Sequence, residues 1–245
     1  MDRLIGENHQ IDISVVVPVY NEEGNLPILI PQIVEVLDPL GKTYEMIFID
    51  DGSNDQSRQI LKEMISQYPQ IRILGFKKNC GETAASAAGL KEARGEIVIT
   101  IDADLQNDPK DIPTMLGYLK DYDMVTGWRQ KREDSWVKRI TSKIANWIRN
   151  WLSGEEIRDS GCTFRAYKRE CLQNLKLYKG MHRFMPTLVK MNGFRVIEIP
   201  ISHHPRKFGV SKYNTWNRMW CALVDLLAVK WMKSRHIHYE IEERI

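Results

Sequence analysis

Four short runs of almost unbroken apolar residues occupy the first hundred positions of the chain. They cover residues 13–19, 45–49, 71–76 and 97–101. Continuous apolar runs are typical of parallel strands that are buried on both faces of a sheet. The pattern therefore predicts four parallel strands.

The segments between these strands carry helix signals. Residues 53–56 read S-N-D-Q, a capping-box pattern, which predicts a helix that begins after Ser53 and runs to about Tyr68. Residues 81–93 predict a second helix, rich in alanine and glycine, and such small residues allow close packing on a sheet or close approach to a ligand. The alternation predicts an open α/β sheet that binds its ligand outside the carboxyl ends of the strands.

Acidic residues follow the predicted strands. The first strand leads into P-V-Y-N-E-E at residues 18–23, the second into D-D-G-S at 50–53, and the fourth into D-A-D-L-Q at 102–106. Neither G-x-G-x-x-G nor G-x-x-x-x-G-K-[S/T] occurs, and this disfavours a dinucleotide-dependent oxidoreductase and a P-loop protein. The D-D-G-S segment suits a turn, but one of its acids can also accept a hydrogen bond from a nucleobase or a ribose.

The side chains of Asp102, Asp104 and Gln106 offer a set of hard oxygen ligands. If the chain leaves the strand extended, these alternate residues point to the same side. Two carboxylates and an amide oxygen suit Mg²⁺ or Mn²⁺, with water and substrate phosphates as the remaining ligands. A D-x-D sequence also occurs at solvated strand ends, but its place after a buried strand favours the metal site.

Charge is distributed unevenly along the chain. The formal net charge is +3, yet residues 1–127 hold 11 Lys and Arg against 21 Asp and Glu, a balance of −10, and residues 128–245 carry the opposite excess of +13. All seven tryptophans lie in the basic half. Cationic charge together with tryptophan indicates an anionic surface as a partner.

Two segments of the basic half show apolar residues at helical spacing. The first runs from Trp136 to Trp151, and the second from Trp216 to Trp231, which Lys233 and Arg235 follow. Such stripes can be core faces, but several tryptophans on basic helices favour an interfacial helix on a membrane. The four scattered cysteines, the polar N-terminus and the lack of a long apolar stretch predict a reducing compartment and no transmembrane span.

Six motifs in order give the chain a family resemblance. They are V-V-V-P-V-Y-N-E-E (15–23), D-D-G-S (50–53), D-A-D-L-Q (102–106), D-S-G-C-T-F-R (159–165), H-R-F (182–184) and R-K-F-G-V-S-K-Y (206–213). This combination resembles inverting GT-A glycosyltransferases, and more narrowly the polyprenyl-phosphate sugar synthases, which include dolichol-phosphate mannose synthase and undecaprenyl-phosphate glucosyltransferases.

The resemblance implies roles for particular residues. A nucleoside would be held by Pro18, Tyr20, Glu22 and Asp51, with Asp102 at the nucleotide as well as the metal. The metal on the donor diphosphate would be held by Asp102, Asp104 and Gln106, and Asp104 is the carboxylate that we expect catalysis to need most. The donor and acceptor phosphates would be surrounded by Arg129, Arg139 and Arg165, together with Arg206 and Lys212 of a loop.

A lipid-phosphate acceptor explains the basic half and the absence of an obvious base. Its phosphate has a second pKa near 6, so the attacking oxygen is already ionised at pH 7 and needs positioning rather than deprotonation. We therefore interpret His182, His203 and His204 as structural or substrate-orienting residues.

The sequence thus predicts an α/β protein of the GT-A fold, with an open, mostly parallel sheet and amphipathic membrane-facing helices. Residues 1–205 would form the catalytic domain, and residues 206–245 an acceptor loop and a membrane-associated segment. The predicted reaction is inverting, metal-dependent transfer from a UDP- or GDP-sugar to polyprenyl phosphate, by a peripheral enzyme at the cytoplasmic face of the membrane. Two alternatives stay open: a soluble transferase acting on a saccharide hydroxyl, and a non-catalytic membrane-binding module. Nucleic acid is disfavoured as a partner because the acidic cluster would repel it, and the sequence leaves a homo-oligomer open.

Overall fold

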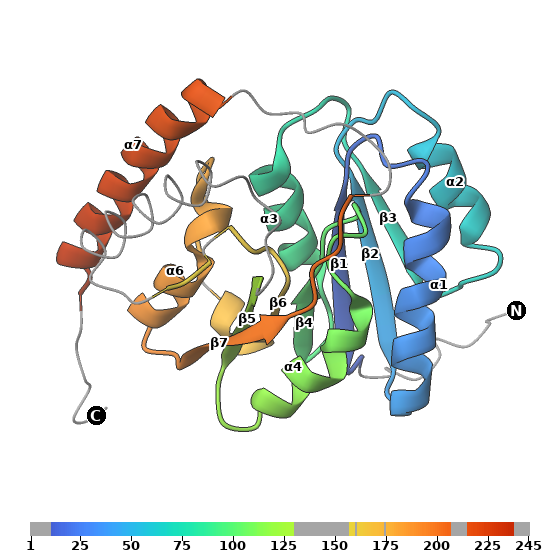
Figure 1. The fold of residues 1–245 in the computed structure, drawn as a ribbon, viewed down its shortest axis with the longest axis horizontal. Helices are drawn as coiled ribbons and strands as arrows, with labels where there is room; N and C mark the ends of the chain where they lie inside the picture. The colour runs from blue at the N-terminus through green and yellow to red at the C-terminus, as the bar shows by residue number, and fades with distance from the viewer. Residues whose placement is uncertain (1–10, 130–156, 160, 174, 207–214, 238–245) are drawn as a thin grey trace, which may run out of the picture.

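A computed structural model describes residues 11–129, 157–159, 161–173, 175–206 and 215–237, with side chains in the last range from Val224 onward (Figure 1). Seven strands form one sheet in the order β3-β2-β1-β4-β6-β5-β7. Their bounds are β1 (Ile13–Val19), β2 (Tyr44–Asp50), β3 (Ile71–Gly75), β4 (Ile97–Thr100), β5 (Met124–Arg129), β6 (Arg165–Lys168) and β7 (Val196–Ile201). The mostly parallel sheet predicted from the apolar runs is confirmed.

The direction of β6 distinguishes this sheet from a fully parallel one. β1 pairs in parallel with β2 and β4, β2 with β3, and β5 with β7, whereas β6 runs antiparallel to both β4 and β5. The four predicted strands correspond to β1–β4 within one residue at each end. The apolar runs did not predict β5, β6 or β7.

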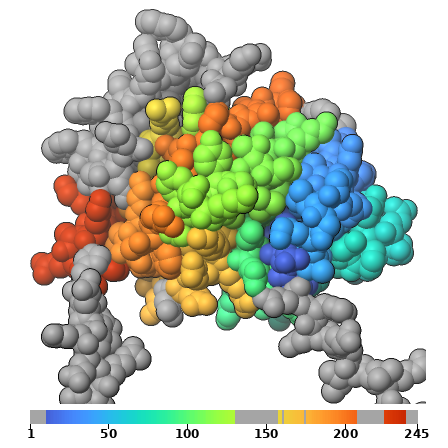
Figure 2. Space-filling model, turned by 90° about the horizontal axis from the view of Figure 1, so that it is seen from below, coloured from blue at the N-terminus to red at the C-terminus, as the bar shows by residue number. Residues whose placement is uncertain are grey.

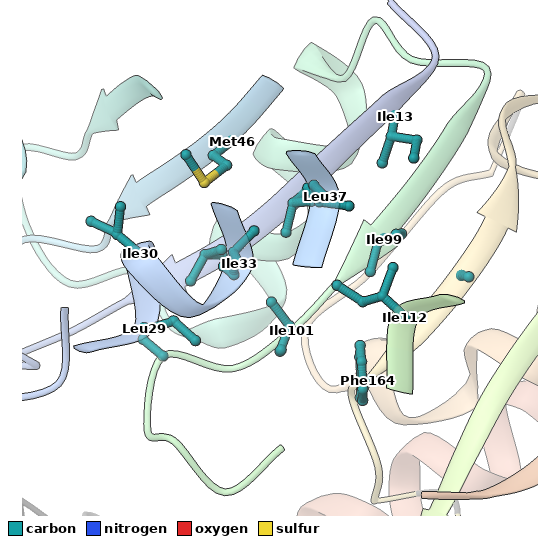
Figure 3. Packing of buried hydrophobic residues seen from close by; sticks show 14 of the residues in the cluster. Ile13, Leu29, Ile30, Ile33, Leu37, Met46, Ile99, Ile101, Ile112 and Phe164 are labelled. Carbon is teal, nitrogen blue, oxygen red and sulfur yellow. The ribbon is translucent and has the colours of Figure 1, made fainter. Parts of the chain in front are cut away.

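Helices cover both faces of the sheet. The α-helices are α1 (Leu26–Leu37), α2 (Ser57–Met64), α3 (Glu82–Glu92), α4 (Ile112–Tyr118), α6 (Met185–Met191) and α7 (Thr215–Ser234), and 3₁₀ helices lie at η1 (Asp38–Leu40), η2 (Pro109–Asp111), η3 (Arg169–Leu172) and η4 (Met181–Phe184). Side chains of β1 alternate between the faces, so Val15 packs with α1 and α4 while Val16 packs under α3. Figure 3 shows the first of these clusters, with Ile13 of β1, Leu37 of α1 and Ile112 of α4.

The small residues of α3 allow it to lie close to the sheet. Gly89 lies against Val16 and Ile49, and a Cβ at this position would overlap both side chains. The expectation of close packing on the sheet is therefore confirmed at Gly89.

The predicted start of α2 is wrong. The helix begins at Ser57 rather than after Ser53, and it ends at Met64, before Tyr68. The Ser53 hydroxyl does not cap it, because Ser53 Oγ accepts a hydrogen bond from the backbone N–H of Asn21 at 3.0 Å. The capping-box residues join two loops instead of starting a helix.

The last described helix packs on the rest of the fold. Leu226 and Val229 of α7 are buried in a cluster with Phe184 and Leu188, next to α6 (Figure 1). Nothing in the described ranges is a helix both long and apolar enough to cross a membrane. The division of the chain at residue 205 stays a prediction.

Candidate active site

The carboxyl ends of β1, β2 and β4 meet at one edge of the sheet. Val19 lies opposite Asp50 in the β1–β2 register, and the N–H of Asp51 donates to the carbonyl of Val19 at 2.8 Å. β4 ends beside β1, where Thr100 lies opposite Val16. The acidic segments that follow these strands are therefore neighbours, as the sequence predicts.

Two loops at this edge are fastened together. The N–H of Glu22 donates to Ser57 Oγ at 2.8 Å, and the N–H of Asn54 donates to Asn21 Oδ1 at 2.8 Å. Asn21 has a left-handed backbone with φ of 55°, a conformation that asparagine tolerates better than most residues. The Glu22 carboxylate accepts a hydrogen bond from Asn25. These bonds fix the loop that carries Tyr20 and Glu22, for which nucleoside binding stays a prediction.

The two acids of D-D-G-S have different partners. Burial acts to raise the pKa of Asp50, but hydrogen bonds from Ser53 and the ion pair with Arg58 outweigh it and hold that pKa below its ordinary value. Asp51 is buried, and its carboxylate accepts from the backbone N–H groups of Cys80 at 2.6 Å and Gly81 at 2.8 Å. Asp51 thus fixes the start of α3, and its predicted contact with the nucleoside would use the remaining lone pairs of the carboxylate.

The chain does not leave β4 extended. Residues 103–105 form a turn in which Leu105 has φ of 60°, so the alternation argument for Asp102, Asp104 and Gln106 is wrong. In this turn Asp104 is buried and its Oδ1 accepts from the N–H of Gln106 at 3.1 Å. The metal-ligand assignment stays a prediction, resting on the donor types.

Asp102 lies in a negatively charged environment. Burial, followed by the charges of Glu82 and Asp104, raises the pKa of Asp102 to about 7, against the opposing effects of Thr163 and Arg165. The carboxylate, together with Pro18, lines a small cavity under α3. A carboxylate whose pKa is raised by neighbouring carboxylates lies where a bound cation would offset the local negative charge.

Each predicted phosphate-binding arginine that the structure describes has a protein partner. Arg129 Nε and Nη2 donate to Asp159 at 2.6 and 2.8 Å, and although burial acts to lower the pKa of Arg129, Asp159 holds it above its ordinary value. Arg165 is buried and donates from Nη1 to the carbonyl of His182 at 2.6 Å. Arg206 donates from Nη2 to Asp104 Oδ2 at 2.6 Å.

The segment before Arg206 follows the D-A-D-L-Q motif closely. Asn107 and His203 form an isolated antiparallel bridge, and the N–H of His204 donates to the carbonyl of Gln106 at 2.8 Å. The predicted phosphate-binding loop therefore begins as a neighbour of the predicted metal ligands.

Three polar residues near the site were missed from the sequence. Thr163 donates to Asp102 Oδ2, Asp159 binds Arg129, and Glu82 lies 3.4 Å from Nε2 of the buried His182. The D-S-G-C-T-F-R motif that contains Thr163 and Asp159 was visible, but their partners come from tertiary pairing: β6 beside β4 brings Thr163 to Asp102, and Asp159 lies beside Arg129 of β5.

Other predicted residues lie outside the described residues. These are Arg139, Lys212 and the amphipathic segment from Trp136 to Trp151. The side chains of Trp216 and Trp220 are also outside the description.

Comparison with known proteins decides the family. Residues 14–176, more than half of the chain, match the family described as "Glycosyl transferase family 2". The chain belongs to glycosyl transferase family 2. The resemblance inferred from the six motifs is thereby confirmed, and the chain is a glycosyltransferase.

Two curated members of glycosyl transferase family 2 are similar over most of the chain. A dodecaprenyl-phosphate galacturonate synthase of Rhizobium johnstonii is 34% identical over 238 residues, which cover 94% of this chain and 70% of that protein. An undecaprenyl-phosphate 4-deoxy-4-formamido-L-arabinose transferase of Pectobacterium atrosepticum is 39% identical over 206 residues, covering 83% of this chain and 63% of that protein.

Solved structures support the GT-A fold of this family member. Glucosyl-3-phosphoglycerate synthase from Mycobacterium tuberculosis, in complex with Mn²⁺, UDP and phosphoglyceric acid, superposes with a TM-score of 0.67 at 19% identity, covering 93% of this chain and 80% of that one. A mannosyltransferase from Pyrobaculum calidifontis, in complex with GDP-Man and Mn²⁺, gives 0.63 at 20% identity, with coverage of 95% and 66%.

Proposed function

We propose that this glycosyltransferase moves a sugar from a nucleotide-sugar to polyprenyl phosphate and inverts the anomeric centre. One observation carries the proposal: a polyprenyl-phosphate sugar synthase aligns with 94% of the chain at 34% identity. The acidic edge of the sheet, with three arginines at or near its carboxylates, is the arrangement that two phosphate-bearing substrates would need.

The donor set fits a divalent cation. Asp102 and Asp104 raise the local negative charge, and no hydrogen bond within the described residues involves the side chain of Gln106. No group of three or more His, Cys, Asp or Glu side chains suited to a metal occurs in the part of the chain that the structure describes, and the proposed charged ligands are the two carboxylates Asp102 and Asp104. Mg²⁺ or Mn²⁺ uses such a site together with substrate phosphates, and it would neutralise charge on the donor diphosphate.

The chain's own residues bind and orient the two substrates. An acceptor phosphate oxygen attacks the anomeric carbon, a new C–O bond forms, and the bond from that carbon to the nucleoside diphosphate breaks with its electron pair on the departing phosphate. The acceptor oxygen is ionised at pH 7, so no general base is needed. Arg129, Arg165 and Arg206, with Arg139 and Lys212, hold the phosphates and stabilise the charge that develops on the leaving group.

Residues at the carboxyl ends of β1 and β2 bind the nucleoside. Pro18 lies near the end of β1, and Tyr20, Glu22 and Asp51 follow on loops that the hydrogen bonds of Glu22 and Asp51 join to one another and to the start of α3. A nucleoside bound to a fixed frame loses less free energy to ordering of the protein.

The outer face of α7 attaches the enzyme peripherally to the cytoplasmic face of an anionic membrane. Val224, Leu227 and Trp231 recur at helical spacing and are 61%, 51% and 64% exposed, on the side opposite the buried Leu226 and Val229. Figure 2 shows the described part of α7 at one side of the molecule. Apolar residues flanked by exposed lysines insert at the headgroup level of a bilayer, where a polyprenyl phosphate is also found.

A transfer assay tests the proposal. Purified protein, Mn²⁺ and a short polyprenyl phosphate would be incubated with a panel of UDP- and GDP-sugars, and lipid-linked sugar would be separated by thin-layer chromatography. We expect product from at least one donor and loss of product in excess chelator. Transfer to a saccharide hydroxyl with no lipid-linked product would refute the proposed acceptor.

A further inference from the structure

Thr163 lies beside Asp102 because of the way β4 and β6 pair. Their antiparallel register matches Ile99 with Ala166 and Thr100 with Arg165. Continued past the strand ends, this register places Asp102, two residues after Thr100, opposite Thr163, two residues before Arg165. Side chains that lie directly opposite in an antiparallel pair share one face and touch.

A hydrogen bond joins the two side chains. The Thr163 hydroxyl donates to Asp102 Oδ2, and the carbonyl of Thr163 accepts from Thr100 Oγ1 at 2.6 Å. The backbone of Thr163 is thus held by β4, and its hydroxyl holds the carboxylate that follows β4. Within the described residues, no protein donor forms a hydrogen bond with the other oxygen of Asp102, so that oxygen is available to a ligand.

The donor at Asp102 is neutral, in contrast to the donor at Asp104. Asp104 is neutralised by the guanidinium of Arg206, whereas the Thr163 hydroxyl orients Asp102 without cancelling its charge. A carboxylate held in place is a better cation ligand than a mobile one, because less side-chain freedom is lost when the cation binds.

We propose that Thr163 is a positioning residue for the metal: it fixes Asp102 so that one carboxylate oxygen stays directed at the cation. The inference rests on the proposed metal site. Hydrogen-bonded partners of metal ligands change metal affinity by about 10–100-fold when they are removed. Thr163 acts through Asp102 and does not itself touch the substrate.

Metal binding without substrate gives the direct test. Mn²⁺ alone would be titrated into nucleotide-free protein and followed by water-proton relaxation, for wild type, Thr163→Val and Thr163→Ser. Valine keeps the branched shape and removes the hydroxyl, whereas serine keeps the hydroxyl and removes the methyl group. We expect Thr163→Val to raise the Kd for Mn²⁺ about tenfold and Thr163→Ser to stay within about threefold of wild type.

A second threonine provides the matched control. Thr126 on β5 is fully buried and its hydroxyl has no hydrogen-bond partner in the described structure, so Thr126→Val should leave the Kd for Mn²⁺ unchanged. Thermal unfolding of each variant would verify that it folds.

The outcomes separate this inference from the proposed function. Wild-type affinity in Thr163→Val, or a Kd in Thr163→Ser as high as in Thr163→Val, would overturn the role of Thr163 and leave the metal site intact. Failure of wild-type protein to bind Mn²⁺ with or without UDP would overturn the metal site of the proposed function, and the role of Thr163 with it.

Discussion

The ion pair between Arg206 and Asp104 predicts that one substitution moves metal affinity and turnover in opposite directions. Arg206 Nη2 lies 2.6 Å from Asp104 Oδ2, and the two side chains are 30% and 10% exposed. A cation that uses Asp104 must displace this guanidinium. Replacement of Arg206 by glutamine removes the competitor, and at the same time removes a proposed ligand of the phosphates.

The size of the effect follows from the exposure of the pair. Fully exposed ion pairs contribute up to about 1 kcal/mol, and hydrogen bonds to charged groups in the interior about 1.5–3 kcal/mol. This pair is partly exposed, and solvent screening weakens it, so we take the upper limit for exposed ion pairs, about 1 kcal/mol. That free energy corresponds to a Kd for Mn²⁺ roughly fivefold lower in Arg206→Gln. Turnover should fall at least about tenfold, because a charge that stabilises the transition state is lost.

Two measurements on the same proteins check this prediction. Water-proton relaxation gives the Kd for Mn²⁺ without nucleotide, and single-turnover transfer gives the rate. Arg206→Lys keeps the charge and should bind Mn²⁺ as wild type does. Arg195→Gln removes one positive charge at the opposite end of β5, where Arg195 pairs with Asp123, and should change neither quantity. A Kd that is unchanged or higher in Arg206→Gln would refute the competition.

Three further predictions concern the metal, the membrane and stability. Asp104→Asn should abolish transfer, because it removes the charge of a proposed metal ligand, and thermal unfolding would verify that the variant folds. Leu227→Glu combined with Trp231→Glu should reduce flotation with anionic vesicles, whereas Tyr118→Glu, on α4, should not; equal flotation of both proteins would remove α7 as the membrane face. Burial acts to raise the pKa of Glu45, but hydrogen bonds from Ser14 and other partners outweigh it and hold that pKa below its ordinary 4.5. The stability that Glu45 contributes is therefore present above pH 4.5 and is lost as the pH falls through the pKa of the folded state. Urea unfolding of Glu45→Gln should therefore show a deficit of roughly 1–3 kcal/mol at pH 7 that shrinks below pH 4.5, and a deficit independent of pH would contradict this.

The apolar pattern was sufficient for β1–β4 because each is a mainly apolar run, almost wholly buried in β1, β2 and β4 and partly buried in the edge strand β3. It was insufficient for β6, whose four residues read R-A-Y-K and include the buried Arg165. Burial of such a strand depends on the neighbours that β4 and β5 provide, which local sequence does not encode.

The candidate site shows the same division between local and tertiary causes. Acids after strands could be placed at one edge, since parallel strands end together. The turn at Leu105 could not be predicted, because a leucine with φ of 60° is disfavoured by its own sterics and is held by the burial of its side chain. The hydroxyls of Ser53 and Thr163 likewise find their partners only once distant strands have paired.

The reversed strand β6 has a consequence for how the molecule opens. β4 and β5 do not pair with each other, because β6 lies between them in the sheet. The hydrogen bonds of this four-residue strand therefore connect strands β1–β4 to β5 and β7. The two parts of the sheet cannot separate while β6 remains bonded on both edges. In native-state hydrogen exchange, the amides of β6 should therefore exchange only through the largest opening event, whereas β3 and β7 at the outer edges exchange through smaller ones. A transferase built this way keeps its donor edge and its arginines in one cooperative unit.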